Sequence, residues 1–378
     1  MPIVFDTRTA SNHFPGIGRY VVNLSRALTQ VTPDLDIALL YDPTATATRL
    51  TLPDLPRITC STSPFSVQQQ WIVPGMLRQA HATLYHNPYY LMPYLPGLPT
   101  VFTCYDLIPL IYPEYFAATQ RLIYRVAHLL ALNTAQVTLA ISRSTGADLV
   151  RYLHADPRRV VITPLAADER FTPQSPEAIA VARRKHALPE QYALYLASNK
   201  PHKNLIGLVQ AWQKANFKFQ TPTLRAGAGV SNVKLVIAGQ WDERYPEARR
   251  LAEELGLQER VIFAGPVEET ILPALYSGAT LFVFPSLYEG FGLPVLEAMA
   301  CGTPVVCSNV SSLPEVVADA AILVNPRDTN ALAEAVGHVL ASQELQQALR
   351  EKGLAQAAKF SWQRTAQETL AVYQQTAR

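Results

Sequence analysis

The sequence predicts an α/β protein of two Rossmann-like, doubly wound domains that face each other across a cleft. Its 378 residues exceed one ordinary domain, since domains average roughly 150 residues. In both halves, short runs rich in Val, Ile and Leu alternate with amphipathic stretches, which is typical of parallel sheets with helical crossovers. A Pro-rich polar segment near the middle separates the two series of strands.

The first series predicts an N-terminal domain over residues 1–175. An amphipathic helix is expected over residues 18–30. The strands of this domain are expected at residues 3–5, 37–41, 100–104, 137–141 and 160–163.

The second series predicts a second domain over residues 176–360. Its six apolar runs read YALYLAS, KLVIAG, RVIFAG, TLFVFPS, TPVVCS and AAILV. Residues 361–378 are expected to form a final helix that packs back toward the N-terminal domain. In open parallel sheets, ligands bind beyond the carboxyl ends of the strands, so the residues after each run are the candidates for chemistry.

Composition excludes several classes of protein. Lys plus Arg number 32 against 30 for Asp plus Glu, without a block of like charge, so no nucleic-acid partner is expected. No secretory signal and no run of 18 apolar residues is evident. The four cysteines form no C-x-x-C pair, so neither a zinc site nor a disulfide framework is expected, and a cytoplasmic location fits best.

The most informative stretch is TLFVFPSLYEGFGLPVLEAMACGTPVVCS, which predicts a strand, a Gly-containing turn, a short helix and another strand. Gly290 and Gly292 precede the predicted helix N-terminus, whose free N–H groups and positive dipole end suit a diphosphate. Glu289 in the turn and Glu297 on the helix can accept hydrogen bonds from sugar and ribose hydroxyls. On spacing alone, the two glutamates fit ordinary surface positions equally well.

This stretch resembles that of glycosyltransferase family 4, retaining enzymes of the GT-B architecture, whose hallmark is Glu, seven residues and Glu in an E-G-F-G context. The resemblance extends through FPGIGRYVVNL, YDLIPLIYPEYF, LAISRSTGADL, ITPLAADERF and PHKNLIGLVQA. It implies that Glu289 contacts the donor sugar and Glu297 the ribose. It also implies a donor site completed by Ser198, Val267 beside the nucleobase, and the backbone of Gly290, Phe291, Gly292 and Leu293.

Lys203 stands at the place of the family's lysine, and an ammonium suits a departing diphosphate because the leaving group gains negative charge. The alternative is a solvated lysine at a helix start. Many family members carry an arginine where this chain has Ala197, so one of the usual two cations is missing. Lys200 or Arg143 could compensate.

In the first domain, Gly16 and Gly18 form a G-x-G between a strand and a helix, which alone is a weak phosphate signal. The resemblance implies that this loop faces the donor phosphates or the acceptor, with Arg19 nearby on the acceptor side. Alternatively, the glycines only shape a turn.

Two further strand ends carry candidate residues. Tyr105 stands where family members commonly have a histidine near the donor sugar, and Asp106 follows it. We expect catalytic roles for both, with turn capping as the alternative for Asp106. His86 and Asn87 are expected on the acceptor side, with a structural role as the alternative.

The resemblance implies a metal-independent, retaining hexosyltransferase of the mannose or glucose type, without a cofactor. The donor would be a GDP- or UDP-linked sugar and the acceptor a saccharide or lipid-linked saccharide of surface polysaccharide or lipopolysaccharide synthesis. A peripheral contact with the inner membrane face would follow from a lipid-linked acceptor. The alternatives are a nucleotide-sugar epimerase of the same architecture and a noncatalytic nucleotide-sugar-binding protein.

Overall fold

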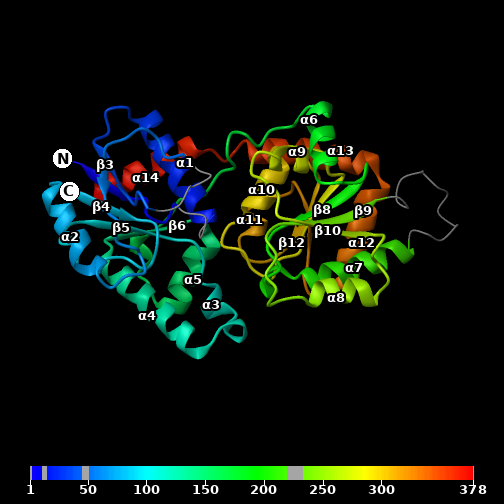
Figure 1. Cartoon of the computed structure of the whole chain (residues 1–378), viewed down its shortest axis with the longest axis horizontal. Coiled ribbons are helices and arrows are strands. Elements are labelled where there is room, and N and C mark those ends of the chain that lie inside the picture. The colour runs from blue at the N-terminus through cyan, green and yellow to red at the C-terminus, as the bar shows by residue number, and fades with distance from the viewer. Residues whose placement is uncertain (1, 11–14, 45–50, 219–232, 378) are drawn as a thin grey trace. The chain divides into compact units, whose positions relative to one another are not determined.

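The computed structural model describes residues 2–10, 15–44, 51–218 and 233–377. The chain divides into two compact units, one of Met1–Leu165 with Ser361–Arg378 and one of Ala166–Phe360 (Figure 1). The boundary falls before the predicted residue 175, because the connecting segment already packs on the second unit. There the Phe171 ring lies 5.9 Å from that of Tyr276, and the Gln174 N–H donates to Ser277 Oγ.

The sheet of the first unit has seven parallel strands in the order β3-β2-β1-β4-β5-β6-β7. Its strand β3 was not predicted, because its three residues are exposed or half-buried and form no apolar run. The strands are β1 Ile3–Asp6, β2 Ile37–Tyr41, β3 Arg57–Thr59, β4 Leu84–Asn87, β5 Thr100–Cys104, β6 Val137–Ala140 and β7 Val160–Ile162.

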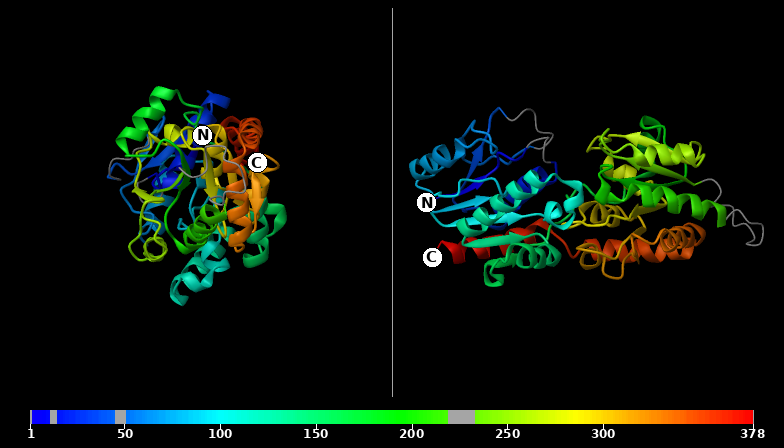
Figure 2. Two further views of the ribbon diagram at one scale, coloured as in Figure 1. Left: turned by 90° about the vertical axis from the view of Figure 1, so that its right-hand side faces the viewer. Right: turned by 90° about the horizontal axis from the view of Figure 1, so that it is seen from below.

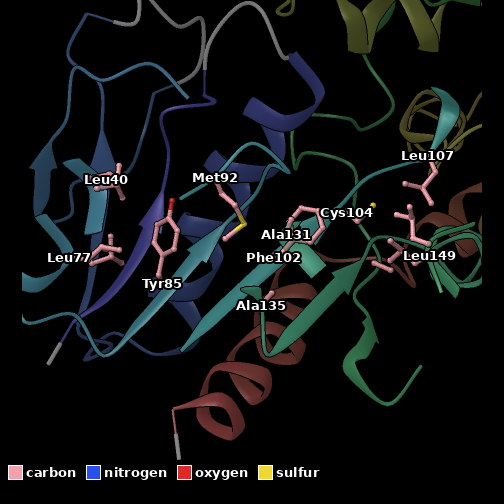
Figure 3. Close-up of a cluster of buried hydrophobic side chains, with 14 of the residues drawn as sticks. Leu40, Leu77, Tyr85, Met92, Phe102, Cys104, Leu107, Ala131, Ala135 and Leu149 are labelled. Atoms are coloured by element: carbon pink, nitrogen blue, oxygen red, sulfur yellow. The ribbon is translucent and has the colours of Figure 1, made fainter. Parts of the chain in front are cut away.

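The core of the first unit lies between this sheet and its helices. Tyr85 of β4, Phe102 of β5 and Leu149 of α5 are among its buried side chains (Figure 3). The helices are α1 Pro15–Val31, α2 Gln69–Gln79, α3 Ile108–Ile111, η1 Pro113–Tyr115, α4 Ala118–Thr134, α5 Arg143–Leu153, η2 Pro157–Arg159 and α14 Trp362–Thr376.

The C-terminal helix α14 belongs to the first unit, although it follows the second along the chain. Ser361 caps it by accepting a hydrogen bond from the Arg364 N–H. Its Trp362 ring lies 6.1 Å from that of Tyr20 on α1. Burial of this aromatic pair holds the end of the chain on the first unit.

The second unit has six parallel strands, as the six apolar runs predict. Their order in the sheet is β10-β9-β8-β11-β12-β13. Helices cover both faces of the sheet (Figure 2). The strands are β8 Tyr192–Leu196, β9 Lys234–Ala238, β10 Val261–Gly265, β11 Leu281–Phe284, β12 Val305–Ser308 and β13 Ile322–Val324. The helices are α6 Pro176–Lys185, η3 Pro201–Lys203, α7 Leu205–Lys218, α8 Glu247–Glu254, α9 Leu272–Ser277, α10 Leu293–Ala300, α11 Leu313–Val317, α12 Thr329–Ala341 and α13 Gln343–Ala357.

Both sheets reverse their strand order at the first strand of their unit: β1 lies between β2 and β4, and β8 between β9 and β11. Ligands in open α/β sheets bind outside the carboxyl ends of the strands at such a point. In the described part of the chain, none of the helices has the length and apolar character needed to span a bilayer.

Candidate functional site

Lys203 and Glu289 follow the two neighbouring strands at the reversal point of the second sheet. The chain leaves β8 at Leu196 and reaches Lys203 at the end of η3, and it leaves β11 at Phe284 and reaches Glu289 before α10. Because β8 and β11 pair in parallel, their carboxyl ends lie at the same edge of the sheet. The fold therefore brings together two residues that are far apart in the sequence.

The Lys203 ammonium donates to both carboxylate oxygens of Glu289, at 2.7 Å to Oε1 and 2.9 Å to Oε2. The two side chains are only 16% and 11% exposed, so water screens the ion pair weakly. The ammonium also lies 5.5 Å from the centre of the Phe284 ring, whose negative face attracts a cation. The Lys203 ammonium and the Glu289 carboxylate are therefore held in place by contacts within the protein.

The turn that carries Lys203 is fixed to the loop that carries Glu289. The Leu287 N–H donates to the His202 carbonyl at 2.7 Å, and Asn204 Nδ2 donates to the Pro285 carbonyl at 3.1 Å. Asn204 has a φ of +57°, a left-handed conformation that Asn tolerates better than most residues. Burial and the neighbouring Lys203 and Lys200 charges lower the pKa of His202 to about 2, so this buried histidine is neutral near pH 7.

Two serines between β12 and α11 hold the other side of the Glu289 loop. Ser311 Oγ accepts from the Glu289 N–H at 2.9 Å, and Ser312 Oγ lies within donating distance of the Glu289 carbonyl at 2.9 Å and the Phe291 carbonyl at 2.7 Å. Gly292 caps α10 with a φ of +104°. The sequence did not single out the serines, since their partners are more than twenty residues away.

Glu297 is placed deeper than Glu289, on α10, as the sequence predicts. Its residue is 2% exposed, and the phenol of fully buried Tyr276 donates to Glu297 Oε2 at 3.0 Å. Tyr276 is held in turn by its carbonyl, which accepts from Thr303 Oγ1 at 2.7 Å. The buried phenol therefore fixes the orientation of the carboxylate.

A small hollow that is partly open to solvent lies at the carboxyl ends of β8, β9 and β10. Ala197 lines it together with Trp241 and Arg249, neither of which the sequence singled out. The Arg249 guanidinium lies 4.5 Å from the Trp241 ring centre and 5.2 Å from that of Phe263. Position 197 is an alanine in this chain, but the Arg249 guanidinium lies at the same pocket.

Ser198 and Val267 occupy connections that follow strands β8 and β10 of this sheet. Ser198 is half-buried, and its carbonyl accepts from the Tyr195 hydroxyl at 3.0 Å. Val267 is also half-buried and lies outside the lining of the pocket. The donor-site roles expected for the two residues stay predictions.

In the first unit, the predicted G-x-G loop is helical. Helix α1 begins at Pro15, so Gly16 and Gly18 lie within its first turns instead of in a loop before it. The missing N–H and fixed φ of proline suit the first position of a helix, which explains the earlier start. Gly16 is exposed, Gly18 is buried and Arg19 is half-buried.

Tyr105 and Asp106 follow β5. Among the described residues the buried Tyr105 hydroxyl has no hydrogen-bond partner, and burial raises the pKa of this phenol well above its usual value. Asp106 Oδ1 accepts from the Ile108 N–H at 3.0 Å and so caps the start of α3, the alternative considered for this residue. Asp106 is therefore engaged in the turn, and the catalytic role expected for Tyr105 stays a prediction.

His86 and Asn87 lie in the core. His86 is 0% exposed, with Nδ1 at 2.5 Å from the Tyr373 hydroxyl and Nε2 at 2.8 Å from the Thr103 hydroxyl. Burial lowers its pKa to about 3. Asn87 is 2% exposed, and its amide donates to the Tyr89 carbonyl. Buried side chains cannot make the acceptor contacts expected for these two residues. The expectation rested on their position at a strand end, which alone does not show which side chains face outward.

A buried ion pair at the end of β1 was missed. Arg8 Nη2 lies 2.6 Å from Asp6 Oδ2, and the two residues are 3% and 1% exposed. The Tyr85 hydroxyl also donates to Asp6 Oδ2 at 2.6 Å, and Arg8 Nη1 donates to the Thr62 carbonyl at 2.8 Å. The signal in the sequence was the charged pair D-T-R directly after an apolar strand.

Among the described residues, no group of three His, Cys, Asp or Glu side chains is arranged to hold a metal ion.

The two Rossmann-like units, with a cation and a carboxylate at the strand ends of the second, define a protein of the GT-B class. Comparisons with known proteins agree. Residues 179–356 match the model of the glycosyl transferases group 1, and residues 15–171 match that of glycosyltransferase family 4. The chain belongs to the glycosyltransferases of family 4, and its second domain matches the group 1 model.

Individual relatives support the assignment. The chain is 33% identical to the O-antigen chain mannosyltransferase B of Escherichia coli over 299 residues, 79% of this chain and 75% of that protein. It is 35% identical to the serotype-specific mannosyltransferase WbdA of E. coli over 71% of this chain, which spans only 32% of WbdA. Sucrose-phosphate synthase from Thermosynechococcus elongatus shares the fold with a TM-score of 0.77 at 24% identity, over 99% of this chain and 98% of that one.

Proposed function

We propose that this glycosyltransferase moves a hexose of the mannose type from a nucleotide diphosphate sugar to a saccharide or lipid-linked saccharide, with retention of configuration. The proposed product belongs to cell-surface polysaccharide or lipopolysaccharide, assembled at the cytoplasmic face of the inner membrane. The mannose preference is supported by the names of relatives that are 33% and 35% identical to this chain. GDP is the expected nucleotide and UDP the second candidate.

The observation that carries the proposal is the Lys203–Glu289 pair beside the N-terminus of α10. Lys203 and the positive dipole end of α10 would stabilise the charge that develops on the departing diphosphate, without a metal ion. Glu289 would accept hydrogen bonds from the sugar, and Glu297 from the ribose. The Trp241–Arg249 pocket next to Ala197 offers an apolar surface and a cation for the rest of the nucleotide.

In the proposed reaction, the acceptor hydroxyl attacks the anomeric carbon from the face that the diphosphate leaves. The bond from this carbon to the phosphate oxygen breaks as the new glycosidic bond forms, through an oxocarbenium-like transition state. The departing phosphate takes the proton of the acceptor hydroxyl. The contribution of the protein is positioning and electrostatic stabilisation.

Thermal unfolding with GDP, UDP, ADP, CDP and dTDP in separate samples tests the nucleotide site. A nucleotide at a hundred times its dissociation constant adds about 2.7 kcal/mol of stability. A shift with GDP supports the proposal, and a shift with UDP alone would move the donor class to UDP-sugars. No shift with any nucleotide would contradict it.

The reaction itself is tested by incubating GDP-mannose with saccharide acceptors and with EDTA. Transfer that persists in EDTA supports metal-independent chemistry. Conversion of the donor sugar without an acceptor would instead identify an epimerase, and binding without turnover a noncatalytic protein. The anomeric configuration of the product, read by NMR, tests retention.

We also propose that helix α4 contacts an anionic lipid surface. Its side chains Leu122, Ile123, Val126 and Leu130 are 63%, 65%, 46% and 40% exposed. The residues of α4 include Arg121 and Arg125 but no Asp or Glu. An exposed apolar face on a helix that carries basic and no acidic residues matches the chemistry of an anionic membrane surface.

Flotation with vesicles of phosphatidylglycerol and phosphatidylethanolamine tests this contact, with pure phosphatidylcholine for comparison. The double variant Leu122→Gln/Ile123→Gln should lose flotation. Its control, Val181→Gln/Ile206→Gln, changes two exposed apolar residues of the second unit, at 48% and 43% exposure, and should float like the wild type. Equal flotation of both variants would contradict the proposal.

A further inference from the structure

The loop that carries Glu289 is buried and is held from two sides. On one side, the Lys203 turn contributes the His202 carbonyl and the Asn204 amide. On the other side, Ser311 and Ser312 engage three main-chain groups of the loop: the N–H and the carbonyl of Glu289 and the carbonyl of Phe291. These contacts determine where the Glu289 carboxylate stands relative to the Lys203 ammonium.

The hydroxyl of Ser311 both donates and accepts a hydrogen bond. It donates to the carbonyl of Val310 at 2.7 Å and accepts from the Glu289 N–H at 2.9 Å. Ser311 has a φ of +53°, a left-handed conformation that costs an ordinary residue free energy. Backbone strain of this kind persists where the surrounding structure imposes it.

Ser312 is fully buried, and its single hydroxyl hydrogen lies between two carbonyl acceptors at 2.9 and 2.7 Å. The next residue, Leu313, packs against the same loop, since a Cβ at Gly292 would lie 2.5 Å from Leu313 Cδ2. The segment of Ser311, Ser312 and Leu313 therefore forms one face of the cradle around Glu289.

We propose that Ser311 and Ser312 are positioning residues that set the Glu289 carboxylate against the donor sugar. This inference rests on the proposed function, because it assigns Glu289 to the sugar. Loss of the serine contacts should therefore lower the turnover of the sugar donor. Binding of the free nucleotide should change little, because the nucleotide is held by other groups.

Ser311→Gly tests the proposal cleanly. Glycine adopts a φ of +53° without strain, so the variant removes the hydroxyl without a cost from backbone conformation. We expect kcat to fall by about tenfold or more, since displacement of a positioned group costs rate. The melting temperature should stay within a few degrees of wild type, and the dissociation constant of the free nucleotide should change less than about twofold. Ser311→Asn tolerates the left-handed region and keeps an acceptor oxygen, so it should recover part of the rate.

Ala187→Gly is the matched control, because Ala187 is an exposed residue of the same unit with a φ of +49°. It should leave the rate unchanged. Wild-type kcat in Ser311→Gly would overturn the inference, as would a fall in rate accompanied by an equal loss of nucleotide binding. Failure of the wild-type protein to bind any nucleotide would overturn the proposed function instead, so the two failures are distinguishable.

Discussion

Lys203 Nζ lies within hydrogen-bonding distance of both carboxylate oxygens of Glu289. The sequence had assigned the two groups to different parts of a donor, the lysine to the diphosphate and the glutamate to the sugar. Because they form one ion pair, the position of each depends on the other. A change at either residue should therefore affect both functions.

Lys203→Met should lower the transfer rate by about 10²- to 10³-fold, since it removes a cation from the leaving group. It should also lower the free energy of unfolding by about 1–3 kcal/mol, because the largely buried Glu289 carboxylate loses its partner. Steady-state kinetics and urea unfolding measure the two effects. Lys352→Met is the control, because it breaks an exposed ion pair with Asp319 and should change neither quantity appreciably.

Tyr276→Phe should weaken donor binding several-fold while changing kcat less. The variant removes the phenol that orients Glu297, the residue assigned to the ribose. Titration calorimetry with the nucleotide measures this, and the loss of one buried hydrogen bond should cost about 1 kcal/mol of stability. In the control Tyr192→Phe, another buried phenol loses its bond to the Leu275 carbonyl, so an equal change in nucleotide affinity in both variants would contradict the assignment.

Much of the fold follows from local patterns. All six strands of the second unit coincide with apolar runs, and the two glutamates lie where the glycines and Pro294 predict them, in a turn and on a helix. The supporting shell could not be predicted in this way. Ser311 and Glu289 are twenty-two positions apart in the sequence, and His86 and Tyr373 are 287 positions apart. No local sequence pattern therefore predicts either contact.

Acidification should destabilise the first unit below about pH 6.5. Burial lowers the pKa values of His86 and His128 to about 3, whereas an unfolded histidine titrates near 6.5. Between pH 3 and pH 6.5 the unfolded chain binds more protons than the folded chain. The free energy of unfolding is therefore unaffected by these two histidines above about pH 6.5, and it falls as the pH drops from about 6.5 toward 3. The slope is about 1.4 kcal/mol per pH unit for each histidine.

His128→Phe tests the pH dependence. Phenylalanine keeps the ring contacts with Tyr90 and Tyr124 but cannot bind a proton. Urea unfolding at pH 7 and pH 5.5 should show a smaller loss of stability on acidification than in the wild type. An unaltered slope in His128→Phe would show that other groups cause the effect.

Two glycine substitutions should separate the two candidate phosphate sites. Gly292→Ala should cost about 1–2 kcal/mol or more, because φ is +104° and the new Cβ would meet Leu313 Cδ2 at 2.5 Å. A Cβ at Gly16 meets none of the described atoms within 4 Å, and Gly16 lies in the first turn of helix α1, so Gly16→Ala should stabilise the protein by at most about 0.5–1 kcal/mol. If a donor phosphate approaches the backbone at Gly16, transfer should nevertheless fall in this more stable variant, because the added methyl group occupies the path of the phosphate. A Gly16→Ala protein with wild-type kinetics would limit the donor site to the second unit, where Gly292 and the N-terminus of α10 would hold the phosphates.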